Sequence, residues 1–406
     1  MSRIVLGVSG GIAAYKACEI LRRLREDSHE VTVVPTENAL RFVGETTFAA
    51  LSGKPVVTDV FTGAAGIPHV RLGRDADFVL VAPATADLIA RQAAGRADDL
   101  LTNVLLTATC PVLVCPAMHT EMWQHPATTQ NVATLRSRGV VVLDPASGRL
   151  AGADSGVGRL PEPAEIVGIA ESLLAGDVCS RAAQRDLAGL SVVVSAGGTH
   201  EAIDPVRFIG NASSGRMGVE IARAAALRGA RVTLVAAHLD VPWPSSVEVR
   251  TVVSAADLAI AMTETAASAD IIVMAAAVAD FTPIAPSGEK LKKSGANGMT
   301  LELTQTTDVL AGLTRARRAG QTIVGFAAET IADETALAAA GREKLSRKGA
   351  DLLVVNDVSD HKVFGMSDTI VMIVGTAGVC DRVAASKAVV AHRILDAAIK
   401  HRATTQ

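Results

Sequence analysis

The stretch Ser195–Gly218, SAGGTHEAIDPVRFIGNASSGRMG, constrains the fold of this chain more than any other segment. An apolar run, Leu190–Val194, leads into it, and a segment of small and apolar residues, Met217–Leu227, leaves it. Strand, glycine turn and helix in this order predict a nucleotide-binding βα unit, in which backbone N–H groups and a helix N-terminus face phosphate. Two such turns, Gly197-Gly198-Thr199 and Ser213-Ser214-Gly215, flank a charged insert. We therefore expect the two turns to hold two anionic groups, or to form two faces of one binding site.

Composition excludes several classes of protein. Apolar residues make up 49% of the 406 residues but aromatic ones only 3%, which suits a parallel sheet covered by helices. No run approaches the roughly 18 apolar residues of a membrane span, so no membrane partner is expected. The net charge of -3 argues against a nucleic-acid partner. Met1-Ser2-Arg3 leads directly into a predicted strand and leaves no room for a signal peptide. The five cysteines include no C-x-x-C pair, which favours a reducing cytoplasm.

Strands and helices alternate along both halves of the chain. We predict α/β architecture with two doubly wound, three-layer domains, residues 1–175 and 190–406, joined by a linker over 176–189. The strands predicted for the first domain are Arg3–Val8, Glu30–Val34, Phe78–Val81, Val112–Cys115 and Val140–Leu143. Those predicted for the second are Leu190–Val194, Arg231–Val235, Val247–Val252, Ile271–Met274, Thr322–Phe326 and Leu352–Val355.

Polar or glycine-rich residues follow four of the strands in the first domain. They are Ser9–Ile12, Thr36 with Asn38, Ala82–Thr85 and Cys115–His119. Ligands of doubly wound sheets bind beyond the C-terminal strand ends, so these residues are candidate contacts. The spacing is not G-x-G-x-x-G, and no acidic residue closes the second strand. A mononucleotide phosphate therefore fits better than NAD.

Four motifs in this half are specific in combination: GVSGGIAAYK, IPHVRL, VAPATADLIARQAAGRADDLL and PAMHTEMW. They resemble the flavin-dependent cysteine decarboxylases, in particular the phosphopantothenoylcysteine decarboxylase half of the bifunctional coenzyme A biosynthesis proteins. The resemblance implies a flavodoxin-like domain with FMN, held by Ser9, Gly10, Gly11, Ile12, Thr36, Asn38, Ala82, Pro83, Ala84, Thr85 and Met118. It also implies that His69 is catalytic. An imidazole titrates near neutrality and can take a thiol proton as FMN accepts a hydride.

Two positions depart from the family pattern. His119 stands where the family usually has an Asn that binds the substrate carboxylate, and we expect His119 to take part in holding the substrate. Gly152 stands where the family's substrate clamp has a proton-donating cysteine. Asp154, Ser155 and water are the alternative donors, unless the final reduction is altered. Arg159 still agrees with the clamp.

The second half resembles the phosphopantothenate–cysteine ligases that use CTP. The opening stretch carries this resemblance together with AAAVADF, EKLKKSG, GFAAET, KLSRKGAD and VND, in the family's order. It implies a Rossmann-like domain in which CTP is bound by Ala277, Asp280, Lys290, Asp308, Phe326, Lys344 and Lys348. Arg207 and Asn211 are implied at the pantothenate end, with Asn211 holding the acyl-cytidylate. Mg²⁺ is expected with the triphosphate, but no carboxylate cluster identifies protein ligands for it.

The residue types fit this chemistry. Joining a carboxylate to an amine requires activation, and CTP supplies it by forming an acyl-cytidylate with release of pyrophosphate. Lysines on a glycine-flanked loop, here Lys290, Lys292 and Lys293, suit the charge that gathers on phosphorus. Lys344 and Lys348 are four residues apart and share one helical face. Asp308 begins a predicted helix, where capping alone would also explain it.

The function predicted is CTP-dependent ligation of 4'-phosphopantothenate to cysteine, followed by FMN-dependent decarboxylation of the product. The alternative is a flavoprotein whose C-terminal domain senses a nucleotide without turnover. A short-chain dehydrogenase is excluded, because Tyr15, the only tyrosine, is followed four residues later by Glu19 rather than lysine. The resemblance also implies a homo-oligomer, with trimers of the flavin domain and dimers of the ligase domain combining into a dodecamer.

Overall fold

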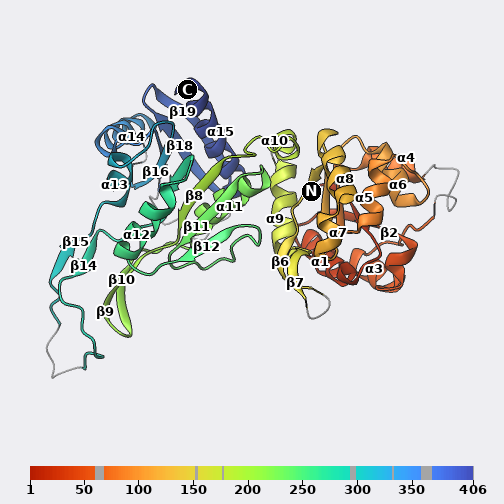
Figure 1. The fold of residues 1–406 in the computed structure, drawn as a ribbon, viewed down its shortest axis with the longest axis horizontal. Helices are drawn as coiled ribbons and strands as arrows, with labels where there is room; N and C mark the ends of the chain where they lie inside the picture. Colours follow the sequence, from red (N-terminus) through yellow and green to blue (C-terminus); the bar gives the residue numbers. More distant parts are fainter. Residues whose placement is uncertain are drawn as a thin grey trace. The chain divides into compact units, whose positions relative to one another are not determined.

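The computed structural model describes residues 1–59, 68–150, 154–175, 178–292, 299–331, 333–357 and 368–405. These residues form two compact units, Met1–Asp186 and Leu187–Gln406, coloured red to yellow and green to blue in Figure 1. Gly152, Lys293 and residues 176–177 of the expected linker lie outside the described residues.

The first unit is built on a five-stranded parallel sheet of order β2-β1-β3-β4-β5. Its strands are β1 (Arg3–Val8), β2 (Glu30–Pro35), β3 (Phe78–Ala84), β4 (Val112–Pro116) and β5 (Val141–Val142). Its helices are η1 (Ile12–Tyr15), α1 (Lys16–Glu26), α2 (Glu37–Leu40), α3 (Glu45–Ser52), α4 (Pro68–Asp75), α5 (Ala86–Ala93), α6 (Leu100–Thr107), α7 (Thr120–Gln124), α8 (Pro126–Ser137), α9 (Pro163–Ala175) and α10 (Cys179–Gln184). Helix α1 packs with α3 and α9, whereas α5 packs with α6 and α8. This strand order is that of the flavodoxin-like folds, as predicted.

The second unit holds an eight-stranded sheet of order β12-β11-β8-β13-β16-β17-β18-β19. Its parallel strands are β8 (Ser191–Ala196), β11 (Arg231–Ala236), β12 (Glu248–Thr251), β13 (Ile271–Met274), β16 (Thr322–Glu329) and β17 (Leu352–Asp357). One layer of helices contains α11 (Arg216–Leu227) and α15 (Lys387–Thr405), and the other contains α12 (Ala255–Ala266), α13 (Val309–Arg315) and α14 (Glu334–Lys348). The predicted three-layer α/β architecture is therefore present in both units.

Two antiparallel strands, β18 (Asp368–Gly375) and β19 (Gly378–Ser386), extend this sheet. The pairing direction of these two strands was not predicted from the sequence. Only residues 376 and 377 separate the two strands, and so short a connection permits a hairpin but no parallel crossover. As a consequence, the end of β19 and the start of β18 lie at the same edge as the C-terminal end of β17.

Three further hairpins were not predicted: β6 (Ala146–Arg149) with β7 (Ser155–Arg159), β9 (His200–Asp204) with β10 (Arg207–Gly210), and β14 (Phe281–Pro283) with β15 (Leu303–Gln305). The segment expected to be a linker, residues 176–189, contains helix α10, which packs against α8 and β5 of the first unit. Arg185 donates to Asp144 at 2.7 Å. In the part of the chain that the structure describes, no helix has the length and apolar character needed to span a membrane.

Candidate active sites

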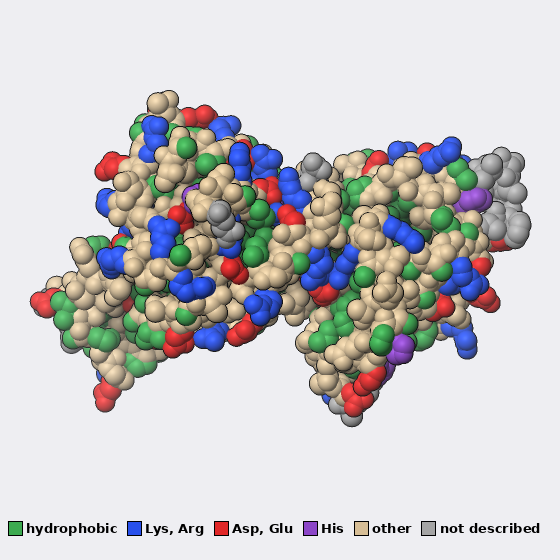
Figure 2. Space-filling model, turned by 45° about the horizontal axis from the view of Figure 1, so that its top comes forward, with side chains coloured by type: hydrophobic (Ala, Val, Ile, Leu, Met, Phe, Trp, Pro, Cys, Tyr) green, Lys and Arg blue, Asp and Glu red, His purple; other side chains and the backbone are tan. Residues whose placement is uncertain are grey.

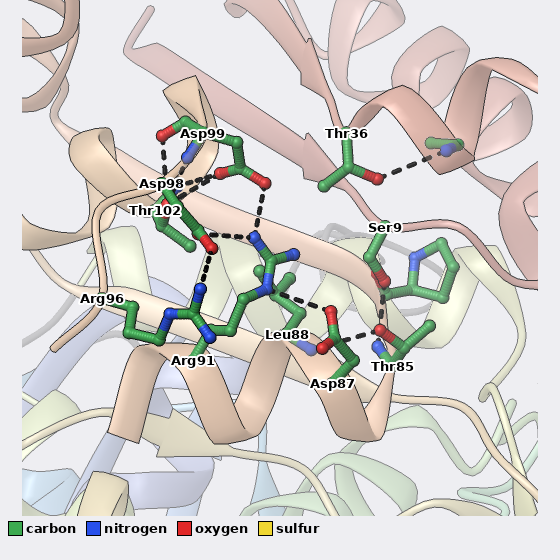
Figure 3. A network of polar contacts seen from close by, with 12 residues as sticks. Ser9, Thr36, Thr85, Asp87, Leu88, Arg91, Arg96, Asp98, Asp99 and Thr102 are labelled. Atoms are coloured by element: carbon green, nitrogen blue, oxygen red, sulfur yellow. Dashed lines mark hydrogen bonds and ion pairs between the residues drawn. The ribbon is translucent and has the colours of Figure 1, made fainter. Parts of the chain in front are cut away.

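Hydrogen bonds tie the strand ends of the first unit together. The Ser9 hydroxyl donates to the Pro83 carbonyl at 2.8 Å and accepts from the Thr85 N–H at 2.9 Å, which ties the end of β1 to the end of β3 (Figure 3). The Thr36 N–H donates to the Val8 carbonyl at 2.9 Å. Thr36 and Thr85 cap α2 and α5 through their hydroxyl oxygens. The structure thus brings together candidate residues that are more than 70 positions apart.

A glycine turn follows β1 and lies against the loop that follows β2. A Cβ atom on Gly10 would lie 2.4 Å from the Cβ of Asn38, so only glycine lets the two loops approach this closely. Gly11 precedes η1 without a side-chain cap, and the following Ile12 is 63% exposed. The backbone N–H groups of an uncapped turn can bind a phosphate group. The exposed apolar side chain beside the turn can contact a ring system joined to that phosphate. The residues present therefore fit a flavin mononucleotide.

Charged residues brace the far end of α5. Arg91 donates to Asp87 at 3.0 Å, to Asp98 at 3.0 Å and to Asp99 at 2.7 Å (Figure 3). Burial lowers the pKa of Arg91, but the hydrogen bonds that Arg91 donates to Asp99 and Asp98 outweigh it and raise the pKa overall. Asp99 also caps α6 through a capping box with Thr102. This network fixes α5, and with it the N-cap residue Thr85, against α6.

His69 lies in the first turn of α4. Its carbonyl accepts from the Thr107 hydroxyl at 2.9 Å, which ties the start of α4 to the end of α6. The Nδ1 atom of the imidazole is buried and has no hydrogen-bond partner within the described ranges. A ring nitrogen in this state can take up or give a proton to a bound molecule.

The β6–β7 hairpin packs on the loop that carries Met118 and His119. The Met118 N–H donates to the Gly158 carbonyl at 3.0 Å, and a Cβ on Gly158 would lie 2.1 Å from the Met118 carbonyl oxygen. His119 precedes α7, and its side chain makes no capping hydrogen bond. Arg159 pairs with Glu162, which also accepts from Lys16 at 3.2 Å. The hairpin expected to act as the clamp is therefore in contact with the motif that carries His119.

The second unit contains a cleft of about 1000 Å³ at the C-terminal strand ends. Of the residues predicted for this domain, the cleft is lined by Asn211, Ala277, Asp280, Asp308, Phe326, Lys344 and Lys348. Lys290 and Arg207 do not line it. The second glycine turn, Ser213–Gly215, is part of the lining.

The first glycine turn, Gly197-Gly198-Thr199, packs closely against neighbouring segments. A Cβ on Gly197 would lie 2.2 Å from the His238 carbonyl oxygen, and the backbone φ of Gly197 is +89°. Thr199 and Ala277 are linked across the turn, with the Thr199 N–H donating to the Ala277 carbonyl at 3.1 Å. The turn therefore joins neighbouring segments at the strand ends, and its residues are not among those that line the cleft.

Cations on α14 face the cleft. Lys344 donates to Glu329 at 3.1 Å, and Lys348 pairs with Asp308. Asp308 also caps α13, accepting from the Ala311 N–H at 3.0 Å, as the capping interpretation predicts. Burial raises the pKa of Asp308, but Lys348 and the Ala311 N–H outweigh it and lower the pKa overall. Arg347, which the sequence analysis missed, also lines the cleft.

The segment that carries Lys290 is attached to the β9–β10 hairpin. Asp204 accepts from the N–H groups of Arg207 at 2.9 Å and Leu291 at 3.1 Å. Arg207 in turn donates to the Leu291 carbonyl at 2.6 Å. The Arg207 side chain lowers the pKa of the inaccessible Asp204 carboxyl to about 2. Arg207 therefore anchors the neighbour of Lys290.

Further cleft residues escaped the sequence analysis, among them Arg216, Thr369 and Lys387. Arg216 follows the second glycine turn directly, so its place in the motif was a usable signal. Thr369 and Lys387 come from the antiparallel end of the sheet, and only the topology brings them to the cleft.

Comparison with known families fits this geometry. The "Flavoprotein" family model matches residues 1–174. The model described as "DNA/pantothenate metabolism flavoprotein C-terminal domain" matches residues 187–401. Together with the two α/β units, these matches define the chain as a two-domain flavoprotein of pantothenate metabolism.

Full-length relatives define the family more closely. The coenzyme A biosynthesis bifunctional protein CoaBC of Mycobacterium tuberculosis is 55% identical over 404 residues, covering 98% of this chain and 96% of the relative. The protein of the same name from Vibrio parahaemolyticus is 41% identical and covers 97% of each chain. A crystal structure of the C-terminal domain of a CoaBC protein shares 31% identity at a TM-score of 0.44, covering 53% of this chain and 96% of that one.

The chain belongs to the family of bifunctional coenzyme A biosynthesis proteins. It is an enzyme with a phosphopantothenoylcysteine decarboxylase half and a phosphopantothenate–cysteine ligase half. The resemblance stated from the motifs is confirmed. The alternative of a C-terminal domain that only senses a nucleotide is not supported.

Proposed function

We propose that the second unit uses CTP to join 4'-phosphopantothenate to cysteine, and that the first unit decarboxylates the product with FMN. The observation that carries this proposal is a pair of separate candidate sites in one chain. One is the glycine turn beside the exposed Ile12, and the other is the cleft lined by Lys344 and Lys348.

In the first unit, the turn Ser9–Ile12 and Thr36 would hold the FMN phosphate, while Ala82–Thr85 and Met118 would lie by the ring. Bound FMN supplies an acceptor for the hydride of the substrate. His69 takes the thiol proton, a role that its unpartnered Nδ1 supports. His119 holds the substrate carboxylate under the β6–β7 hairpin, to which Arg159 belongs. Asp154, just before β7, Ser155, its first residue, and water remain the candidate donors in place of the family's cysteine.

In the second unit, Asn211 holds the acyl group. Its amide donates to the Val278 carbonyl at 3.0 Å, so the amide oxygen can face the reacting acyl group without acting as a nucleophile. Asp280, Phe326, Lys344 and Lys348 would bind CTP together with Mg²⁺. Lys290 would stabilise the charge on phosphorus after its segment moves from the hairpin toward the cleft.

Both halves of the proposal can be tested in one assay with CTP, 4'-phosphopantothenate and cysteine. We expect a yellow protein that releases pyrophosphate and CO₂ and forms phosphopantetheine. His69→Asn should stop CO₂ release while pyrophosphate release and bound flavin are retained. A colourless protein that gains no flavin on addition of FMN would contradict the decarboxylase assignment, and CTP-independent ligation would contradict the ligase assignment.

The assembly is also a proposal. We infer a homo-oligomer in the cytoplasm, with trimers of the first unit and dimers of the second combining into a dodecamer. Exposed apolar side chains support it: Tyr15 and Leu106 in the first unit, and Phe208, Phe281 and Ile284 on the hairpins of the second. Light scattering on the purified protein tests it, because a monomer mass at micromolar concentration would contradict every part of the scheme.

A further inference from the structure

Lys344, one of the cations that line the ligase cleft, is held by a carboxylate that is not itself part of the lining. Its ammonium donates to Glu329 at 3.1 Å, and the two side chains are 29% and 26% exposed. Glu329 is the last residue of β16, whereas Phe326, Ala327 and Ala328 of the same strand line the cleft. Glu329 therefore contacts Lys344 without occupying the cleft.

The packing of α14 fixes the backbone of Lys344 but not its side chain. Leu337, Gly341 and Leu345 form the buried face of this helix. A Cβ on Gly341 would lie 2.9 Å from the Val355 side chain, so α14 packs closely on β17 about one turn before Lys344. A lysine side chain has a flexible four-carbon stem, and its ammonium needs a further contact to keep one position. Among the described residues, Glu329 provides that contact.

The second lysine of this helix is held in the same way. Lys348 pairs with Asp308, whose carboxylate also accepts from the Ala311 N–H as the N-cap of α13. Lys344 and Lys348 lie one helical turn apart, and each is held by a carboxylate from a different element. This repeated arrangement indicates that the positions of both ammonium groups are set before a ligand binds.

An ion pair beside a cleft for an anion has two opposing effects on binding. An ammonium group has three N–H donors, so the bond to Glu329 leaves two for phosphate oxygens. Holding the ammonium in place also reduces the entropy that is lost when the ligand binds. The carboxylate repels a phosphate, but the Lys344 charge at 3.1 Å largely neutralises it. We expect the positioning effect to be the larger one.

We propose that Glu329 is a positioning residue of the ligase, which holds the Lys344 ammonium in the orientation that binds a phosphate of CTP. This inference rests on the proposed ligase function. It goes beyond that function by assigning a role to a side chain that acts through Lys344 rather than on the nucleotide.

A double-mutant cycle on the full-length chain tests whether Glu329 acts through Lys344. The variants are Glu329→Ala, Lys344→Met and the double variant, each titrated calorimetrically with CTP in the presence of Mg²⁺. Glu329→Ala should weaken CTP binding about fivefold, the upper range for a partly exposed ion pair. In the Lys344→Met background the same substitution should weaken binding no further, because no ammonium remains to be held.

Two further variants separate positioning from charge. Glu329→Gln keeps a carbonyl oxygen that can accept from Lys344, so it should bind CTP within about twofold of wild type. Glu343→Ala removes an exposed carboxylate from the residue next to Lys344 and is the matched control for net charge. It should bind CTP as the wild type does. If Glu329→Ala does not fold, as judged by thermal unfolding, Glu329→Ser takes its place in the same cycle.

The inference is overturned if Glu329→Ala binds CTP as tightly as wild type or more tightly. It is overturned equally if the substitution weakens binding to the same extent with and without Lys344, because Glu329 then has a general structural role. In either case a wild-type protein that binds CTP and releases pyrophosphate keeps the ligase function. A wild-type protein that binds no CTP removes the proposed ligase function together with the inference.

Discussion

Asp204 shows how one carboxylate can organise a reactive segment. Its pKa lies below the ordinary value of 3.8, at about 2, chiefly because Arg207 donates to it. The folded state therefore favours the ionised form. The resulting stabilisation is present in full above about pH 4 and is lost as pH falls through about 2. We expect Asp204→Asn to lower the midpoint of thermal unfolding at pH 7, with the difference from wild type shrinking between pH 4 and pH 2. A difference that stays constant over this range would contradict the ion pair as its cause.

Lys290 and Lys292 form a matched pair of exposed lysines on the segment that Asp204 anchors. Lys290→Gln should reduce pyrophosphate release by about 100-fold or more, the typical cost of losing one group that stabilises transition-state charge. Lys292→Gln should cost less than Lys290→Gln, because the resemblance assigns Lys290, among the lysines of this loop, to the triphosphate and to catalysis. Steady-state pyrophosphate release measures both, with CO₂ release from added phosphopantothenoylcysteine as the folding control. Equal losses in the two variants would indicate a general electrostatic effect of the segment.

At the scale of residues, many of the residues that line the ligase cleft could be predicted from the sequence, and others could not. Asn211, Asp280 and Lys344 line one cavity because each follows, or faces, the end of a predicted parallel strand. Thr369 and Lys387 could not be placed this way, since their position depends on antiparallel pairing at the sheet edge. Nor does the sequence reveal that Lys290 is attached outside the cleft, because that position depends on hydrogen bonds across 84 and 87 residues.

At the scale of elements, Gly158 is where the β6–β7 hairpin meets the Met118 loop. Its φ of +156° and the 2.1 Å approach of a Cβ to the Met118 carbonyl leave no room for a side chain. Gly158→Ala should therefore displace the hairpin and reduce decarboxylation by about tenfold or more, since small misplacements of positioning groups are costly. Gly168→Ala, inside α9 with nothing within 4 Å of the added Cβ, is the control and should be neutral or slightly stabilising. Single-turnover CO₂ release measures both; pyrophosphate release should be unchanged in each. Normal decarboxylation by Gly158→Ala would show that the hairpin has no part in that reaction.

The parallel strands and long helices were predictable because their burial follows a simple pattern. Every residue of β3 is buried, so the strand is a continuous apolar run in the sequence. The hairpins lack this signal. Three of the four residues of β10 and all residues of β15 are exposed. Neither strand therefore shows the alternation of buried and exposed residues that a half-buried strand has. Their pairing depends on contacts between segments, such as the Ile203 carbonyl with the Ser287 N–H at 2.9 Å.

At the scale of the whole molecule, α10 decides where the chain can be divided. Val178, Ala182 and Ala183 are each at most 3% exposed, and Arg185 pairs with Asp144. A first-unit fragment ending at residue 186 keeps these contacts, whereas one ending at residue 175, the domain end expected from the sequence, loses them. Burial of this size contributes roughly 2–4 kcal/mol to the free energy of unfolding. Fragment 1–175 should therefore unfold at a lower denaturant concentration than fragment 1–186, with a similar dependence of the unfolding free energy on denaturant. Both should bind FMN at low temperature.

Fragment 187–406 should release pyrophosphate without either first-unit fragment. Leu187, which begins the second unit, is fully buried, and its N–H donates to the Arg228 carbonyl at 3.0 Å. Equal stability of the two first-unit fragments would mean that α10 adds nothing to the first unit, and inactivity of a folded fragment 187–406 would mean that ligation needs the flavin unit as well.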